Sequence, residues 1–180
     1  MLQRNYANTY KFYVILNMIE VLKRESVLHK YNTVEELPLA DQELLKLAKE
    51  AVDTSYAPYS NFHVGCALRL NNGVIVKGSN QENIAYPSGL CAERVAIFSA
   101  GATYPNEGVQ AMAITVKADK FKVTEPIMSC GACLQSMSEY EIRFKQPMRI
   151  ILQGETGVVY IAEGLKTFLP YMFWTDELKG

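Results

Sequence analysis

Residues 62–79, FHVGCALRLNNGVIVKGS, decide the fold because they combine two short apolar runs with a tight turn. The runs are Phe62–Leu70 and Val74–Ser79, and Asn71-Asn72-Gly73 lies between them. An Asn-Gly pair between two strand-like runs is a strong signal for a β-hairpin, because these residues accept the positive φ angles of a tight turn. The sequence therefore predicts an antiparallel pair of strands here.

A helix is expected before the hairpin. Its apolar residues recur with the spacing of a one-sided helix, and Asp41 is placed to cap its N-terminus. The helix should end before Pro58, because the residue before a proline is pushed out of helical geometry. The expected apolar face consists of Leu44, Leu45, Ala48, Ala51 and Val52.

The chain after the hairpin alternates between helices and strands. Val95, Ile97 and Phe98 are expected to reach the core from the first of these helices. Helices are expected at 91–100, 130–141 and 165–168, and strands at 109–116, 148–152 and 158–161. This order predicts a three-layer α/β/α sandwich with a mixed central sheet.

Residues 1–37 differ in character from the rest of the chain. A polar stretch is followed by an apolar run from Phe12 to Leu22, expected as a strand or helix, and by a charged connector that ends at Pro38. We expect an N-terminal extension over 1–37, with an open role, and one domain over 38–180.

Composition excludes several classes of protein. The chain has 180 residues, of which 49% are hydrophobic, and 18 basic side chains stand against 19 acidic ones. A net charge of -1 disfavours a protein whose surface grips nucleic acid. Asn17 and Glu20 interrupt the longest apolar run, so no membrane span is expected. Four cysteines without a secretion signal predict a cytoplasmic protein with reduced thiols.

The cysteines indicate a metal site. Cys130 and Cys133 lie one helical turn apart, and Cys91 begins a separate helix with Glu93 two residues later. Helix N-termini favour thiolates. Three thiolates can hold a zinc ion whose fourth position stays open to water, which is typical of catalytic zinc. Glu93 would then lie near that position, where a carboxylate can move protons.

Other interpretations of the cysteines stay open at this point. The pair could be a redox couple or buried inert thiols, or could join Cys66 in a four-cysteine structural zinc site. Cys66 lies within an apolar strand, where cysteine commonly packs as a small hydrophobe. His29 and His63 are placed for surface or structural roles rather than as ligands.

A family resemblance narrows these possibilities. Cys91-Ala92-Glu93-Arg94 followed by Cys130-Gly131-Ala132-Cys133-Leu134-Gln135 resembles the small, homotetrameric cytidine deaminases that bind zinc through three cysteines. The resemblance extends over about 41–174. It also includes the segments 56–62, Val64-Gly65, 80–83, Tyr86-Pro87 and 168–173.

The resemblance implies roles for the substrate-binding residues. Asn80 and Glu82 resemble the pair that bonds the ribose hydroxyls, and in an alternating strand they would share one face. Phe62 resembles the aromatic residue that packs on the pyrimidine ring, although alone it would be taken as a core residue. The backbone of Ala92 would meet the edge of the base beside Glu93.

The resemblance also implies one Zn²⁺ per subunit, bound by Cys91, Cys130 and Cys133, and a homotetramer. Tyr86 and Phe173 resemble positions that reach the site of a neighbouring subunit, although alone each would be taken as a core aromatic residue.

The chain departs from the family pattern at two positions. Ser129 and Leu134 replace the usual proline and arginine around the cysteine pair, and Arg94 keeps its motif place. Three thiolates and a divalent zinc sum to -1, so the loss of one nearby positive charge bears on catalytic rate and substrate identity.

The expected function is therefore the zinc-dependent deamination of cytidine and 2′-deoxycytidine, with Glu93 as the catalytic residue. The alternatives are a deaminase of another aminopyrimidine nucleoside, such as an antibiotic, and a zinc-stabilised binding protein that has lost catalysis. A nucleic-acid editing enzyme is disfavoured, because a near-neutral chain offers no evident basic groove.

Overall fold

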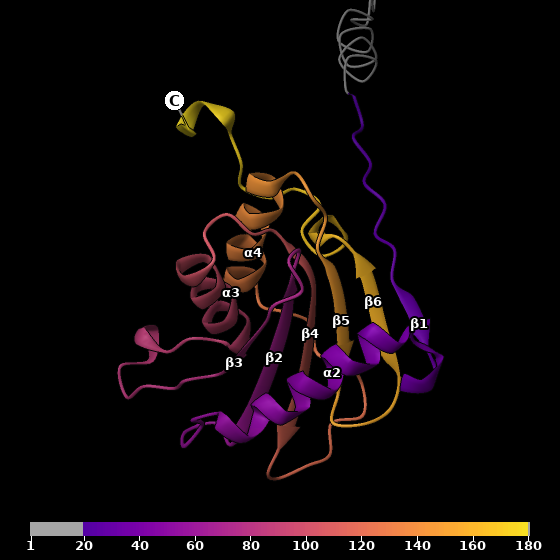
Figure 1. The fold of residues 1–180 in the computed structure, drawn as a ribbon, viewed down its shortest axis with the longest axis vertical. Helices are drawn as coiled ribbons and strands as arrows, with labels where there is room; N and C mark the ends of the chain where they lie inside the picture. Colours follow the sequence, from indigo (N-terminus) through magenta and orange to yellow (C-terminus); the bar gives the residue numbers. More distant parts are fainter. Residues whose placement is uncertain (1–19, 180) are drawn as a thin grey trace, which may run out of the picture.

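A six-stranded mixed sheet forms the centre of the molecule (Figure 1). The structure is a computed structural model, and it describes residues 20–179. The strand order is β1-β6-β5-β4-β2-β3. The strands are β1 (His29–Tyr31), β2 (Phe62–Leu70), β3 (Ile75–Ser79), β4 (Val109–Ala118), β5 (Arg149–Gln153) and β6 (Val159–Glu163).

The predicted hairpin is confirmed. β2 and β3 pair antiparallel, with Gly65 opposite Ser79, and Gly73 in the turn has a φ of 84°. A second antiparallel pair joins β5 to β6. β4 pairs with β2 antiparallel and with β5 parallel, so the sheet is mixed as expected.

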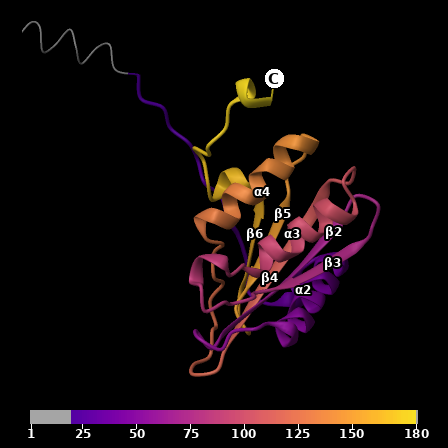
Figure 2. The same ribbon diagram turned by 90° about the vertical axis from the view of Figure 1, so that its left-hand side faces the viewer.

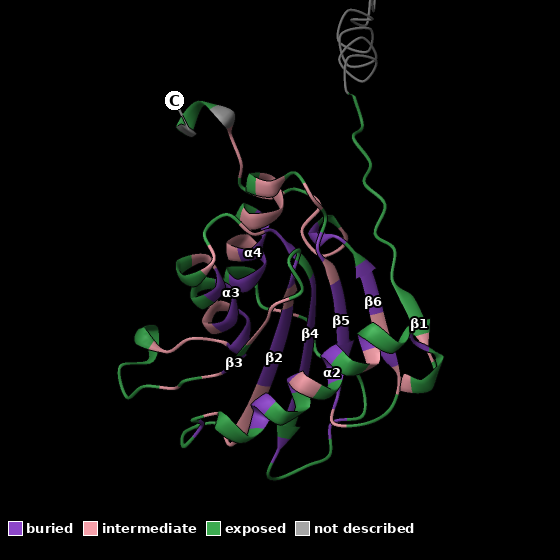
Figure 3. Cartoon of the chain, viewed as in Figure 1, coloured by how far each residue is buried: buried purple, intermediate pink, exposed green. Residues whose placement is uncertain are grey.

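Helices cover the two faces of the sheet (Figure 2). α2 (Leu39–Ala51) packs on one face, and its predicted apolar side is buried. α3 (Ala92–Thr103) and α4 (Gly131–Phe144) pack on the other face around Cys66, Ile97 and Met137. The strands between these layers are largely buried (Figure 3). The three-layer α/β/α architecture is confirmed. Within the described residues, no helix is long and apolar enough to cross a membrane.

Two glycines set the distance between the sheet and its helices. A Cβ at Gly65 of β2 would lie 2.1 Å from the carbonyl oxygen of Ala48 in α2. A Cβ at Gly78 of β3 would lie 2.6 Å from both the Ala92 oxygen and the Ala96 nitrogen of α3. Any larger residue would push these backbones apart, so Gly78 allows the first turn of α3 to lie directly on β3.

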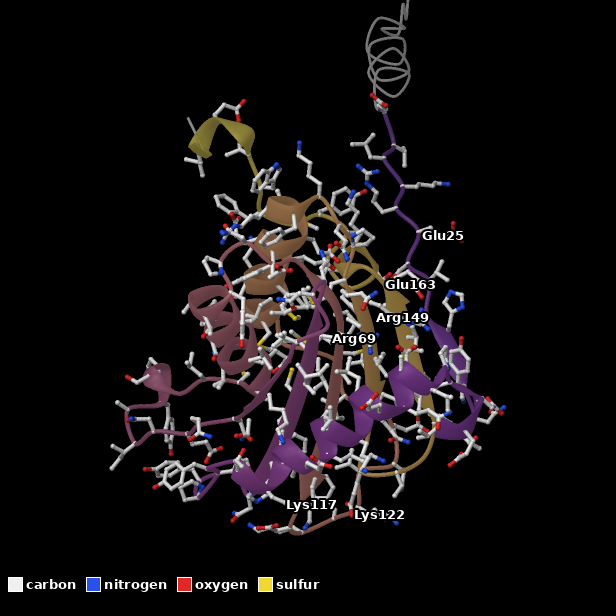
Figure 4. The ribbon with its side chains drawn as sticks, viewed as in Figure 1. Glu25, Arg69, Lys117, Lys122, Arg149 and Glu163 are labelled. Carbon is white, nitrogen blue, oxygen red and sulfur yellow. The ribbon has the colours of Figure 1, made fainter. Side chains whose placement is uncertain are left out.

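Asp41 does not cap the helix, contrary to the sequence prediction. Pro38 is the N-cap residue of α2, and its carbonyl accepts the N–H groups of Asp41 and Gln42. The Asp41 carboxylate is buried against the sheet, where Arg149 donates to it at 2.9 Å and Arg69 lies at 3.7 Å. Figure 4 shows the labelled Arg149 beside Glu163, with which it forms a further ion pair.

Two smaller expectations also differ from the structure. Phe98 is exposed rather than in the core, because it lies on the outer side of α3, while Ile97 is buried. The helix expected at 165–168 is a single 3₁₀ turn, Leu165–Thr167.

The N-terminal extension contributes a strand to the sheet. β1 lies before residue 38 and pairs with β6, with Lys30 opposite Tyr160, and Leu37 is buried under α2. Most of the apolar run expected at 12–22 lies outside the described residues, and Glu20–Leu22 form no regular element.

Candidate active site

The three cysteines of the two motifs occupy equivalent places on two helices. Cys91 is the N-cap residue of α3 and Cys130 is the N-cap residue of α4, each with extended backbone angles. Their carbonyls accept the N–H groups of Val95 and Leu134, so each helix starts immediately after a thiol. Cys133 follows in the first turn of α4. The thiols therefore lie where the helix dipoles stabilise negative charge.

The sulfur atoms converge to the spacing that a metal ion requires. The Sγ atoms of Cys91, Cys130 and Cys133 all lie within 4.8 Å of one another, and those of Cys91 and Cys130 are 3.9 Å apart. Two sulfurs bound to zinc at 2.3 Å in tetrahedral geometry lie about 3.8 Å apart. The donor set therefore fits zinc, with one position left for a further ligand.

Hydrogen bonding within this cluster favours a thiolate. The thiol of Cys133 lowers the pKa of Cys91 to about 6, although burial and the charge of Glu93 act in the opposite direction. The same interaction raises the pKa of Cys133. Arg94 adds a positive charge, with its Nη2 atom 4.0 Å from the Cys91 sulfur.

Cys66 is separate from the cluster. Its side chain is 0% exposed in the core around α3 and α4, and it is not among the three sulfurs that converge. Burial raises the pKa of its thiol well above the ordinary value. The structure therefore favours core packing for Cys66 over the four-cysteine site.

The histidines hold structural positions. His63 shares a hydrogen bond of 2.6 Å with Ser55 and pairs with Asp119 at 3.5 Å. His29 lies on the edge strand β1 and is exposed. Neither belongs to the group of metal-ligating side chains found among the described residues.

Glu93 lies beside the sulfur cluster. It occupies the first turn of α3 and is only 4% exposed, yet it lines the cleft at the cysteines. Among the described residues, none donates a hydrogen bond to its carboxylate. Glu93 therefore offers a buried carboxylate that is available to a bound molecule.

A cleft of about 810 Å³ opens next to this cluster. Cys91, Glu93 and Cys130 line it together with several apolar residues. These apolar residues include Val64, Ile114, Val116, Ile127 and Met128. Phe62, Asn80, Glu82 and Tyr86, which the sequence indicated, line the same cleft.

Asn80 and Glu82 reach the cleft from a loop rather than from a strand, because β3 ends at Ser79. The Asn80 amide accepts the N–H of Val64 at 2.8 Å and donates to the carbonyl of Phe62 at 2.9 Å. Asn80 therefore clamps the start of β2, and each polar atom of its amide keeps capacity for one further hydrogen bond.

Glu82 is held by backbone donors. One carboxylate oxygen, Oε2, accepts the N–H groups of Tyr59 at 2.9 Å and Ser60 at 3.2 Å. Desolvation acts to raise the pKa of Glu82, but the hydrogen bonds from Ser60 and Tyr59 outweigh it, so the pKa is lower than the ordinary value. Glu82 is therefore an ionised acceptor in the cleft.

Ala92, Tyr86 and Phe173, the other residues that the sequence indicated for substrate binding, differ in their position relative to the cleft. Ala92, between Cys91 and Glu93 in the chain, is fully buried and is not among the residues that line the cleft. Tyr86 is 73% exposed at the cleft and makes an edge-on contact with Tyr59. Phe173 does not line the cleft of its own chain and is 73% exposed.

Ile127 and Met128 also line the cleft, although no sequence motif indicated them. They precede Ser129 and Cys130 in a loop, and their apolar character was the available signal. Leu134, which replaces the family arginine, is buried in the core. The Nε atom of Arg94 and the hydroxyl of Ser129 are buried without a hydrogen-bond partner among the described residues.

Comparison with known proteins identifies relatives along most of the chain. The family profile described as the cytidine and deoxycytidylate deaminase zinc-binding region matches residues 39–145. The cytidine deaminase of Halalkalibacterium halodurans is 42% identical over 137 residues, which cover 76% of this chain and 96% of that protein. The cytidine deaminase of Mycobacterium tuberculosis is 32% identical over 146 residues, with coverage of 79% and 96%.

Solved structures agree with this relationship. The cytidine deaminase of Burkholderia pseudomallei superposes with a TM-score of 0.64 at 38% identity, covering 73% of this chain and 97% of that one. The cytidine deaminase of Mycobacterium tuberculosis gives a TM-score of 0.60 at 26% identity, with coverage of 77% and 100%.

Proposed function

The chain belongs to the cytidine and deoxycytidylate deaminase family, and on this basis we propose that it hydrolyses cytidine and 2′-deoxycytidine to uridine and 2′-deoxyuridine, releasing ammonia. Pyrimidine salvage is the role expected of such an enzyme. The observation that carries the proposal is the convergence of three thiols and a buried carboxylate at one cleft.

Cys91, Cys130 and Cys133 would hold the zinc ion, one per subunit. When bound, zinc lowers the pKa of a water molecule and so supplies an oxygen nucleophile at neutral pH. The three thiolates carry more negative charge than the ion neutralises. Arg94 lies close enough to Cys91 to offset part of the excess, and Leu134 supplies no second positive charge.

Glu93 performs the proton transfers. It accepts one proton of the attacking water as the oxygen bonds to C4 of the pyrimidine, and it passes this proton to N3. It then accepts the second proton of the same oxygen and passes it to the departing amino group. The C4–N bond breaks, ammonia leaves, and the oxygen remains on C4 as the carbonyl of uridine. The burial of Glu93 keeps bulk water away from these transfers.

The remaining cleft residues bind the nucleoside. Phe62 packs on the pyrimidine ring, and the backbone of Ala92 meets the edge of the base beside Glu93. Asn80 and Glu82 bond the ribose hydroxyls, since each has an oxygen or N–H that the backbone does not use.

The active unit in this proposal is a homotetramer, with neither nucleic acid nor membrane as a partner. Tyr86, which also lines the cleft of its own chain, and Phe173 would reach the cleft of a neighbouring subunit, and the assembly would cover two aromatic rings that are exposed in the single chain. The four cysteines form no disulfide, which suits a reducing, cytoplasmic environment.

The test is an absorbance assay of cytidine and free cytosine, run beside zinc quantitation. The proposal predicts one zinc per chain and cytidine turnover that exceeds cytosine turnover by about 10⁴-fold. The reason is that free cytosine has no ribose, so the polar side chains that bind the ribose hydroxyls would be left without hydrogen-bond partners. Equal rates on the two compounds would contradict the ribose contacts. Bound zinc without turnover of any aminopyrimidine nucleoside would instead support a binding protein.

A further inference from the structure

Residues 20–31, here called the N-terminal strap, are a part of the chain that the proposed chemistry does not use. The strap is exposed along most of its length, and its last three residues form β1 (Figure 3). The family profile begins only at residue 39. The match to the Halalkalibacterium protein covers 96% of that relative but 76% of this chain, so this chain carries residues that the relative lacks.

The strap contacts the C-terminal segment, defined as residues 165–175, at three points. The Ser26 hydroxyl donates to the Thr167 carbonyl, and the Tyr171 hydroxyl donates to the Leu22 carbonyl at 3.2 Å. The Arg24 guanidinium lies 5.8 Å from the centre of the Tyr171 ring. Figure 2 shows the indigo strap running beside the yellow C-terminal segment.

Gln135 of α4 holds the same segment at a second place. Its side-chain Nε2 donates to the carbonyl of Phe173 at 3.0 Å, and its Oε1 accepts the N–H of Phe173 at 3.3 Å. This reciprocal pair imitates the bonding between two strands. Gln135 follows Cys133 by two residues, so the segment is tied to the helix that carries two of the three thiols.

These contacts leave Phe173 facing outward. The residue is fixed through its backbone, while its side chain is 73% exposed. Because the segment is held at Thr167, Tyr171 and Phe173, the Phe173 ring has little freedom to fold back onto its own chain.

We propose that the N-terminal strap and Gln135 are positioning elements, which hold the C-terminal segment so that Phe173 reaches the site of a neighbouring copy of this chain. The inference rests on the proposed function, because that function gives Phe173 its place at a neighbouring site. The strap could instead serve only to cover the open edge of β6. However, β1 alone covers that edge, and the contacts with Thr167 and Tyr171 lie beyond the sheet.

The experiment uses the full chain with the double substitution Arg24→Ala/Tyr171→Phe, which removes the ring contact and the hydroxyl bond but keeps the aromatic ring. Lys23→Ala is the matched control, since it also removes a positive charge from the strap and Lys23 has no hydrogen bond or ion pair to a described residue. Hydrogen exchange is measured at the Phe173 amide, because none of the three substituted side chains contacts that amide.

We expect exchange at Phe173 to become roughly three- to tenfold faster in the double variant, and the KM for cytidine to rise by a similar factor with kcat less affected. The Lys23→Ala protein should match the wild type in exchange and kinetics. In a Phe173→Ala background, the double substitution should have no further effect on KM.

Unchanged exchange at Phe173 in the double variant would overturn the inference, whatever the activity of the protein. An equal rise in KM with and without Phe173 would also overturn it, because the strap would then act by another route. If the wild-type protein fails to turn over cytidine, the proposed function fails. The exchange measurement still decides whether the strap holds the C-terminal segment.

Discussion

At the scale of single residues, the site depends on cysteines at helix N-cap positions. A cysteine there has extended backbone angles and makes no side-chain cap hydrogen bond, while its carbonyl still accepts a helical N–H. Cys91 and Cys130 both use this arrangement, and Cys133 adds a thiol one turn into α4. The geometry brings three thiols together from two helices without distorting either one.

Single Cys→Ala substitutions test this arrangement. Alanine at Cys91, Cys130 or Cys133 should reduce bound zinc to well below one per chain, because two sulfurs cannot complete the site. Alanine at Cys66 should keep the zinc and reduce only stability, since Cys66 packs in the core. Metal analysis of the four purified variants is the measurement. Zinc lost with Cys66→Ala but kept with Cys133→Ala would contradict the assignment.

Residue motifs predicted much of the cleft but not all of it. The sequence indicated Phe62, Asn80, Glu82 and Tyr86, and the structure brings them to the cleft that Cys91 and Glu93 line. Ile127 and Met128 could not be found in this way, because their place depends on how the loop after β4 returns to α4. The bonds between Asn80 and β2 also depend on a tertiary contact between residues far apart in the chain.

At the scale of elements, the contact between β3 and α3 positions Cys91 and Glu93, to which the proposed function gives the chemistry. Gly78 lies against the backbone of Ala92 and Ala96, so α3 begins directly over the strand. The first turn of α3 carries Cys91 and Glu93, and a shift of this helix would move both relative to α4. The spacing of the zinc ligands therefore depends on a residue that does not touch the metal.

Gly78→Ala should destabilise the fold by about 1–3 kcal/mol, as overpacking against backbone usually does, and should weaken zinc binding. Denaturant unfolding and zinc titration measure the two effects. Gly73→Ala is the control, because it strains a turn with a φ of 84° but meets no neighbouring atom. The control should lose stability without losing zinc affinity. Equal zinc affinity in the two variants would show that the close approach does not position the ligands.

Elements with strong local patterns were predictable, and elements that depend on partners were not. The hairpin and the three helices follow from turn residues and apolar spacing. β1 has only three residues and is defined by its backbone pairing with β6, so no sequence pattern predicted it. Asp41 was predicted as a cap because Asp favours that position, but its ion pairs with Arg149 and Arg69 require the folded sheet.

At the scale of the whole molecule, the strand order assembles the cleft. Sequence predicts pairs joined by tight turns, such as β2 with β3. The parallel pairing of β4 with β5 requires the long crossover that contains α4. This crossover carries Cys130 and Cys133 to the α3 face of the sheet, beside Cys91. The architecture could be predicted, but the order of all six strands could not.

The single chain leaves aromatic residues exposed, including Tyr86 and Phe173. We therefore expect the active species to be a homotetramer of 20.2 kDa chains. Light scattering gives the mass, and activity followed across dilution tests whether assembly is needed. Specific activity should fall as the assembly dissociates. A fully active species with the mass of one chain would contradict a site shared between subunits.

The central claim is that Glu93 moves the protons while three thiols hold zinc. Its most direct test is the turnover of cytidine by Glu93→Gln protein with its zinc content measured, because glutamine keeps size and hydrogen bonding but cannot titrate. The account predicts one zinc per chain, unchanged folding, and a rate lower by about 10²–10⁴-fold. Turnover near the wild-type rate in zinc-replete Glu93→Gln protein would contradict it.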